Sequence, residues 1–191
     1  FFADGSCGKY SIKDNPTHHK YSWAINNQNL EILSRTKGYL EQIEPHFEFK
    51  ILDTTKSAGV YTLVCKGQNR LLVQKYRPIL YDKDAHKKVP YVILNSSTEI
   101  RKWFMDGYWV GDGAKTNQKN TCCCNGKIGA QGLYYIFQSL GHNVTIQTRD
   151  YKPNVYWFLL TKSDITERRE RIRSITELDP VDLDSDYVYD I

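Results

Sequence analysis

The sequence lacks several features that would place it outside or across a membrane. Its 191 residues include no apolar run close to the about 18 residues that a membrane-spanning helix needs. The five cysteines are odd in number, and three stand together at 122–124, unlike a secreted disulfide framework. We therefore expect an intracellular protein, not a secreted one. Met105 is the single methionine and residue 1 is Phe, so we also expect that the chain does not begin at its own translation start.

Zinc-binding signals are also scarce. No Cys-x-x-Cys pair occurs, and His142 is the nearest histidine after the cysteine run. If 121–125 is a strand, Cys122 and Cys124 share one face and Cys123 takes the other. A zinc site at these cysteines is kept only as an alternative.

The composition and charge indicate a folded protein with a basic body. Hydrophobic residues make up 40% and charged residues 25%, which excludes disorder for most of the chain. The net charge is only +4, but residues 1–149 carry 20 basic and 12 acidic residues, whereas 150–191 carry 6 and 10. A basic body with an acidic tail is compatible with a polyanionic partner, and a solvated mixed surface is the alternative that charge alone favours.

The hydrophobic pattern predicts a series of elements that occurs twice. The first part has predicted strands at 7–13 and 18–26, a helix at 28–43, strands near 47–51 and 60–66, and a helix at 70–81. After an irregular stretch at 89–94, the second part has a helix at 96–112, a strand at 121–125, a helix at 127–140, and strands at 144–148 and 155–160 around a turn at 150–154. We expect the order strand-strand-helix-strand-strand after Asp4-Gly5 and again, 108 residues later, after Asp112-Gly113, where 121–125 is the strand named before the helix.

Two local signals fix the ends of the predicted helices. Ser96 and Glu99 fit a capping box at the start of the helix that ends at Asp112. Gly113 and Gly141 follow their helices, where glycine supplies a left-handed cap.

The carboxylate of Asp112 lies at an unfavourable position. A negative charge at a helix C-terminus is repelled by the helix dipole, which destabilises the helix by about 0.3–1 kcal/mol. Gly107 and Gly111 share one helix face, and small residues allow two helix backbones to approach closely. If Ala3 packs against that face, Asp4 and Asp112 end at the same edge. Two carboxylates there would form a hard-oxygen site suited to Mg²⁺, whereas a plain helix cap is the alternative.

These residues resemble a known family. Met105–Gly113 (MDGYWVGDG) looks like the helix motif of the double-motif LAGLIDADG homing endonucleases embedded in inteins, and Phe1–Gly5 (FFADG) resembles the last five positions of the first copy. The surroundings are also similar. They comprise Lys87-Lys88-Val89-Pro90, whose Pro90 lies 22 residues before Asp112, together with Gly132-Leu133 and Ser139-Leu140-Gly141. The stretch 186–191 resembles a strand that re-enters the splicing domain.

The resemblance implies an α+β fold: a pseudo-twofold pair of αββαββα repeats with antiparallel DNA-binding sheets. The first repeat would cover 1–95, without the start of its first helix, the second 96–173, and an acidic tail toward the splicing domain 174–191. It implies a monomeric enzyme inside a larger intein-containing host protein. This enzyme would make metal-dependent double-strand breaks in duplex DNA at a long asymmetric site.

The resemblance also implies roles for individual residues. Asp4 and Asp112 would bind two or three Mg²⁺ ions, with Mn²⁺ as a substitute and the backbone carbonyls of Ala3 and Gly111 as further ligands. Lys87 would stabilise charge at the scissile phosphate or polarise the attacking water, with Lys88 as the near alternative. The matching basic residue of the second repeat stays open among Lys162, Arg168, Arg169 and Arg171.

DNA recognition would fall to alternating polar residues on one face of each sheet, which would follow the major groove. The first-repeat candidates are Lys9, Ser11, Lys13, Lys20, Ser22, Lys50 and Lys66, and the others are Lys88, Lys115, Lys119, Gln147, Arg149 and Lys152. Some would contact phosphates without reading sequence. Most aromatic residues, Trp157 among them, are expected in the core.

Other readings of the sequence remain open. No N-terminal Cys or Ser nucleophile and no C-terminal His-Asn pair is present, so the chain as given should not splice itself. A binder of the same fold that does not cut, either a maturase-like RNA cofactor or a decayed endonuclease, is the main alternative. A metabolic enzyme has little support, because no phosphate-binding glycine loop stands out.

Overall fold

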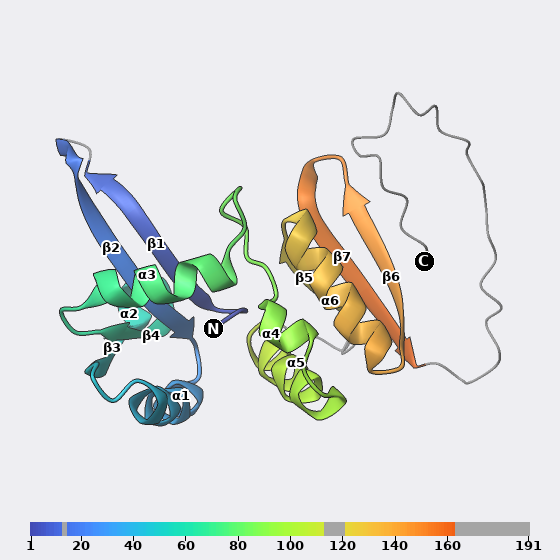
Figure 1. Ribbon diagram of the computed structural model, residues 1–191, viewed down its shortest axis with the longest axis horizontal. Helices are drawn as coiled ribbons and strands as arrows, with labels where there is room; N and C mark the ends of the chain where they lie inside the picture. The colour runs from blue at the N-terminus through green and yellow to red at the C-terminus, as the bar shows by residue number, and fades with distance from the viewer. Residues whose placement is uncertain (13–14, 113–120, 163–191) are drawn as a thin grey trace.

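The computed structural model describes residues 1–12, 15–112 and 121–162, and Figure 1 shows them as two α+β halves side by side. The first half consists of β1 (Gly5–Ile12), β2 (Asn15–Asn27), α1 (Leu30–Ile43), β3 (Phe49–Thr54), α2 (Thr55–Ala58), β4 (Val60–Cys65) and α3 (Asn69–Leu80). The second half consists of α4 (Tyr91–Leu94), α5 (Thr98–Asp112), β5 (Thr121–Asn125), α6 (Lys127–Ser139), β6 (His142–Arg149) and β7 (Lys152–Lys162).

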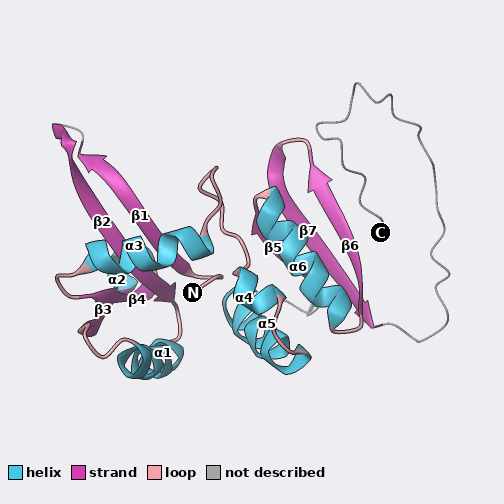
Figure 2. Ribbon diagram, in the orientation of Figure 1, coloured by secondary structure: helices cyan, strands magenta, loops and turns pink. Residues whose placement is uncertain are grey.

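Each half contains an antiparallel sheet with helices on one face (Figure 2). The strand order is β1-β2-β4-β3 in the first half and β5-β7-β6 in the second. The order β2-β4-β3 therefore corresponds to β5-β7-β6, and α1 corresponds to α6. The predicted repeat is confirmed in its topology, with one difference: within the described ranges a single strand, not two, precedes α6.

Two hydrophobic cores lie between the sheets and their helices. Leu33, Leu63 and Leu72 are fully buried in the first core, and Leu133, Ile136 and Phe137 in the second. The N-terminal turn connects the cores, because the ring of Phe1 lies 5.5 Å from that of Trp23 while Phe2 lies 5.5 Å from Phe104 and Tyr108. The segment Phe1–Asp4 thus lies between the two halves.

Three local predictions were wrong, and one helical turn was not predicted. Ser97, not Ser96, caps α5, since its Oγ accepts from Ile100 N at 3.4 Å, and Ser96 Oγ instead donates to Ile93 O at 2.7 Å. The stretch 91–94 forms the helical turn α4, although 89–94 was expected to be extended or irregular, and the turn α2 was not predicted. Strand β7 begins at Lys152 and includes Pro153, which precedes the stretch that pairs with β5 from Val155 onward.

Other local features agree with the sequence. Gly141 follows α6 with a φ of 81°, the left-handed conformation expected after a helix end. Among the residues that the structure describes, no helix is long and apolar enough to cross a lipid bilayer.

Candidate functional site

The two Asp-Gly segments meet where α5 ends beside the N-terminal turn. A Cβ placed on Gly111 would lie 2.4 Å from Ala3 Cβ and 2.7 Å from Asp4 Oδ2, so the glycine allows an approach that no side chain would permit. Asp112 follows Gly111 directly, and Asp4 follows Ala3. The structure therefore brings both aspartates to one edge, as the sequence predicts. A Cβ on Gly107, by contrast, would meet no atom within 4 Å.

The Asp4 carboxylate acts electrostatically on Asp112. Partial burial raises the pKa of Asp112, and the nearby Asp4 carboxylate raises it further, while the Lys87 ammonium acts in the opposite direction. Like charges held together in this way are relieved by a cation. The physical chemistry of the pair thus favours a positively charged partner at this edge.

Asn27 holds the Asp4 side chain in place. Its Nδ2 donates to Asp4 Oδ2 at 2.8 Å, and the backbone N of Asn26 donates to Asp4 O at 3.2 Å. Asn27 is itself oriented, because its Oδ1 accepts from Asn29 N at 2.8 Å. Nothing in the sequence singles out Asn27, since an Asn between a strand and a helix cap is indistinguishable from an ordinary turn residue.

Lys87 reaches the same edge from the segment that connects the halves. Its Nζ donates to the backbone O of Ala3 at 2.5 Å. Burial lowers the pKa of Lys87, while the carboxylates of Asp112 and Asp4 oppose that change. Lys88 fixes the segment through its backbone N, which donates to Leu80 O at 2.8 Å. Of the two lysines that the sequence left as alternatives, the structure places Lys87 beside the carboxylates.

A cavity of about 260 Å³ opens beside Asp112 and Lys87. Cys123 contributes to its wall, and Tyr108 Oη donates to Cys123 O at 2.7 Å. As predicted for a strand, Cys122 and Cys124 are buried together whereas Cys123 is exposed. Among the described residues, no group of three or more His, Cys, Asp or Glu side chains could hold a metal.

The donor set nevertheless fits a hard divalent cation. Asp4 and Asp112 supply carboxylate oxygens, and such ions complete their shells with carbonyl, water and phosphate oxygens. The packing at Gly111 holds the two carboxylates at one edge without side-chain bulk between them. The Ala3 carbonyl, one of the predicted ligands, accepts from Lys87 in this structure.

The first sheet has one face without helices, and the predicted DNA-binding residues divide between its two faces. Cys7, Trp23 and Leu63 face the helices, and the antiparallel register places every second residue on the opposite, open face. Lys20, Ser22 and Lys50 lie on the open face. Lys9 and Ser11 share the alternation of Cys7 and lie on the helix side, so the first-sheet candidates do not line a single face.

Tyr10 adds an aromatic ring to this open face. It is 53% exposed and pairs in register with Lys20. A Cβ on Gly8 would lie 2.6 Å from the Tyr10 ring, which shows that the ring covers the glycine. Lys66 is a weaker candidate, because its Nζ forms an ion pair with Glu48.

The open face of the second sheet carries a tryptophan that was predicted to lie in the core. Trp157 is only half-buried and pairs in register with Cys123 and Gln147, whereas its neighbour Phe158 is 1% exposed. The Arg149 guanidinium lies 4.8 Å from the Trp157 ring centre. The prediction for Trp157 was wrong because an apolar strand with one helix-covered face buries only alternate residues.

The β6–β7 turn holds Arg149 in place. Its Nη1 donates to Tyr151 Oη at 2.7 Å, and Lys152 Nζ lies 6.0 Å from the Tyr151 ring centre. Gln147, Arg149 and Lys152, all predicted DNA-binding residues, thus lie at one end of the second sheet. Together with Trp157 they form a basic and aromatic surface.

Comparison with solved structures identifies this architecture. The chain superposes on I-DmoI bound to DNA and Mn with a TM-score of 0.60 and 17% identity, over 83% of each chain. A structure of a mesophilic variant of the homing endonuclease I-DmoI superposes with a TM-score of 0.60, over 83% of this chain and 82% of that one. The chain has the LAGLIDADG homing endonuclease fold. The expected α+β fold with antiparallel sheets is confirmed.

The whole chain aligns with part of a DNA polymerase of Acanthamoeba polyphaga mimivirus at 44% identity. The chain spans only 11% of the length of that polymerase. No known protein-family model matches the chain. A further I-DmoI complex, with DNA and Ca, superposes with a TM-score of 0.56 and 17% identity, over 83% of this chain and 77% of that one.

Several residues for which the sequence predicted a role lie outside the part of the chain that the structure describes. They are Lys13, Gly113, Lys115 and Lys119, the candidates Arg168, Arg169 and Arg171, the side chain of Lys162, and the tail 174–191. The predicted boundary at residue 95 stays a prediction. Val89, Ile93 and Leu94, which precede it, pack in the second core.

The like-charge pair predicts a gain in stability when Asp112 is neutralised. In chelator at pH 7, Asp112→Asn should raise the free energy of unfolding by up to about 0.5 kcal/mol after solvent screening. A carboxyl whose pKa is raised by folding destabilises the folded state when ionised, so the gain should vanish as the pH falls through the pKa of Asp112. Thermal melts at pH 7 and pH 4 measure this gain. An equal gain at both pH values, or an equal gain for the exposed Asp106→Asn, would contradict the coupling.

Proposed function

We propose that the protein is a site-specific endonuclease that cuts both strands of duplex DNA in a metal-dependent reaction. The observation that carries the proposal is the convergence of Asp4, Asp112 and Lys87 at one edge. The solved I-DmoI structures of the same fold contain DNA with Mn, Ca or, for one variant, Mg. Those ligands support the proposal for this chain by analogy of fold.

Asp4 and Asp112 would hold the divalent ions, with the carbonyls of Ala3 and Gly111 as candidate further ligands. When bound, Mg²⁺ or Mn²⁺ supplies Lewis-acid stabilisation of the phosphate and lowers the pKa of a bound water. Asn27 then serves as a positioning residue, because its amide fixes one Asp4 oxygen and leaves the other available.

Lys87 would act on the charge that develops during cleavage. Its ammonium lies beside two carboxylates at a partly buried site, where a fixed positive charge is worth more than in water. In the structure it donates to Ala3 O, so it is already directed at the edge where a scissile phosphate would bind. We assign it charge stabilisation at the phosphate or polarisation of the attacking water.

The two open sheet faces would form the DNA-binding surface. On the first sheet this surface includes Tyr10, Lys20, Ser22 and Lys50. On the second it includes Gln147, Arg149, Lys152 and Trp157. Lys9 and Ser11 are not carried into this interface, because they lie on the helix side of β1. The two surfaces differ in composition, which suits a long asymmetric site read by one monomer.

Arg149 offers a test of the second surface. Arg149→Met should weaken binding to duplex DNA by about tenfold and reduce the salt slope of log K by about one, because one phosphate contact is lost. The measurement is fluorescence anisotropy across a salt series in Ca²⁺. Lys37→Met is the matched control, since Lys37 lies on α1 and pairs with Glu41. An unchanged salt slope for Arg149→Met, or an equal change for Lys37→Met, would exclude Arg149 from the interface.

The match to a polymerase suggests the setting of the enzyme. We propose that the chain is the endonuclease part of an intein within a DNA polymerase, because the 44% identity extends over a small fraction of a long polymerase. The protein would then act wherever its target DNA lies. This setting predicts the target as well. It is the polymerase gene without the intein, at the point where the intein-coding sequence would be inserted.

The experiment that tests the proposed function offers the protein a duplex in which the polymerase coding sequence is joined across the whole proposed intein, the matching segment and its flanking splicing parts included, together with a random duplex library. The endonuclease proposal predicts Mg²⁺-dependent cleavage of both strands at one site. Tight binding of structured RNA without cleavage of any duplex would instead establish the non-cutting alternative.

A further inference from the structure

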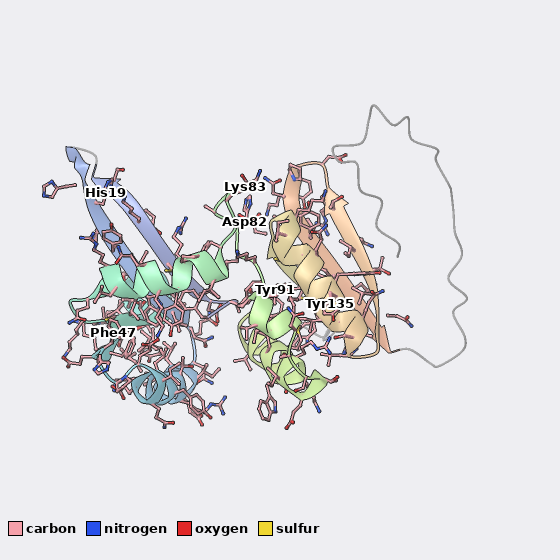
Figure 3. All side chains as sticks on the ribbon, in the orientation of Figure 1. His19, Phe47, Asp82, Lys83, Tyr91 and Tyr135 are labelled. Carbon is pink, nitrogen blue, oxygen red and sulfur yellow. The ribbon has the colours of Figure 1, made fainter. Side chains whose placement is uncertain are left out.

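Lys87 lies on a loop that belongs to neither half. The loop leaves α3 of the first half and reaches α4 of the second, and Figure 3 labels Asp82 and Lys83 on it. Asp82 closes it, because its Oδ1 accepts from the backbone N of His86 at 2.8 Å and its backbone N donates to His86 O at 2.8 Å. Tyr81 and Lys87 then pair as an isolated β-bridge. These contacts fix the loop to α3 but leave its other side free to be fixed by the second half.

The second half contacts the loop at three glycines, one just before α6 and two within it. A Cβ on Gly129 would lie 2.3 Å from Lys87 O and 2.9 Å from Cys124 Sγ. One on Gly126 would lie 2.4 Å from His86 Cβ, and one on Gly132 would lie 2.9 Å from Val89 Cβ. At Gly129 the backbone of the loop therefore rests directly on the backbone of α6, whereas Gly126 and Gly132 leave room for the side chains of His86 and Val89.

This contact bears on the position of the Lys87 ammonium. The backbone of Lys87 contacts Gly129 on α6, while its side chain reaches Ala3 O in the N-terminal turn. Any group larger than hydrogen at 129 must displace the Lys87 carbonyl, since backbone atoms cannot give way as a flexible side chain can. A displacement of the main chain there moves the ammonium relative to both carboxylates.

We propose that Gly129 is a positioning residue: its lack of a side chain lets α6 of the second half set the place of Lys87 beside Asp4 and Asp112. The catalytic part of this inference rests on the proposed function, and the geometric part does not. Sequence patterns alone indicated only that Gly132-Leu133 fits the second repeat. The contact with Lys87 O gives the neighbouring Gly129 a role in addition to its close packing against Cys124 of the second sheet.

The first arm of the test measures the Lys87 contact without any DNA or metal. The ¹³C shift of the Ala3 carbonyl, read by NMR through the amide of Asp4, reports whether the Lys87 ammonium donates to it. Lys87→Met gives the value for the lost contact. Gly129→Ala should move the resonance toward that value, whereas Gly38→Ala, at a helical glycine with no atom within 4 Å of a Cβ, should leave it unchanged.

A second variant covers the case in which Gly129→Ala does not fold. Gly132→Ala meets a side chain at 2.9 Å instead of a backbone carbonyl, so it should move the Ala3 resonance in the same direction by a smaller amount. A wild-type Ala3 resonance in every folded variant of Gly129 or Gly132 would overturn the inference.

The second arm measures cleavage. Gly129→Ala should cut DNA about 10²-fold more slowly, because small misplacements of a reacting group have effects of that size, while its affinity for DNA in Ca²⁺ stays within about twofold of wild type. In the Lys87→Met background the same substitution should cause no further loss. Additive losses would show that Gly129 acts independently of Lys87 and would overturn the inference. If the wild-type protein cuts no duplex, the proposed function fails, and the Ala3 resonance still decides whether Gly129 positions Lys87.

Discussion

Replacing Asp4 or Asp112 with asparagine should reduce double-strand cleavage by about 10³-fold or more. Each carboxylate would hold a divalent ion whose stabilisation of the transition state amounts to several kcal/mol, and each 1.36 kcal/mol corresponds to about tenfold in rate. Asparagine has nearly the same shape as aspartate and keeps the packing at Gly111, so the loss would come from the charge. Cleavage assays at saturating Mg²⁺ with each single variant provide the measurement.

Binding separates this result from a general loss of structure. In Ca²⁺, both variants should bind target DNA within a few-fold of wild type, because the open sheet faces supply most of the contacts. Asp106→Asn, at an exposed position on α5, is the matched control and should cut normally. Full nuclease activity in Asp4→Asn or Asp112→Asn would remove both residues from the mechanism.

Lys87→Met should slow cleavage by about 10²-fold, the usual effect of removing one fixed electrostatic group from an active site. Methionine keeps the length and apolar stem of lysine and removes the ammonium that donates to Ala3 O. The effect should fall on the rate of the chemical step, so single-turnover cleavage at saturating protein is the informative measurement. DNA affinity in Ca²⁺ should change little.

Lys88→Met is the control for Lys87, because the two lysines are neighbours with the same charge. In the structure Lys88 anchors the loop through its backbone N, a contact that the substitution preserves. Its cleavage rate should stay within about threefold of wild type. If instead Lys88→Met cuts poorly and Lys87→Met cuts normally, the roles assigned to the two lysines are exchanged.

The sequence predicted the repeat because each half carries strong local signals. Apolar residues spaced for a helix before Gly141, and alternating residues in β6 and β7, are visible without any tertiary information. The Asp112 helix end was equally visible, since a carboxylate at that position needs compensation. Its meeting with Asp4 followed from the small residues Ala3 and Gly111, whose contact the structure shows.

The remaining features depend on contacts that no local pattern contains. Trp157 was expected in the core because an apolar strand does not reveal which face the helices cover. Lys9 and Lys20 have the same residue type, and only the register of β1 with β2 separates their faces. Asn27 and Gly129 act on residues far away in sequence. Such partners become identifiable only from the folded chain, in which β1 and β2 bring Asn27 to Asp4 and α6 meets the loop that carries Lys87.

The most direct test of the central claim is cleavage of a duplex in which the polymerase coding sequence is joined across the whole proposed intein, with both strands labelled and Mg²⁺ present. The account predicts that the wild-type protein cuts both strands at one position, that chelator stops the reaction, and that Asp4→Asn and Asp112→Asn bind this duplex but leave it intact. Cleavage that continues in chelator, or cleavage at wild-type rate by either variant, would contradict the assignment of the two aspartates as the metal-binding centre of a DNA endonuclease.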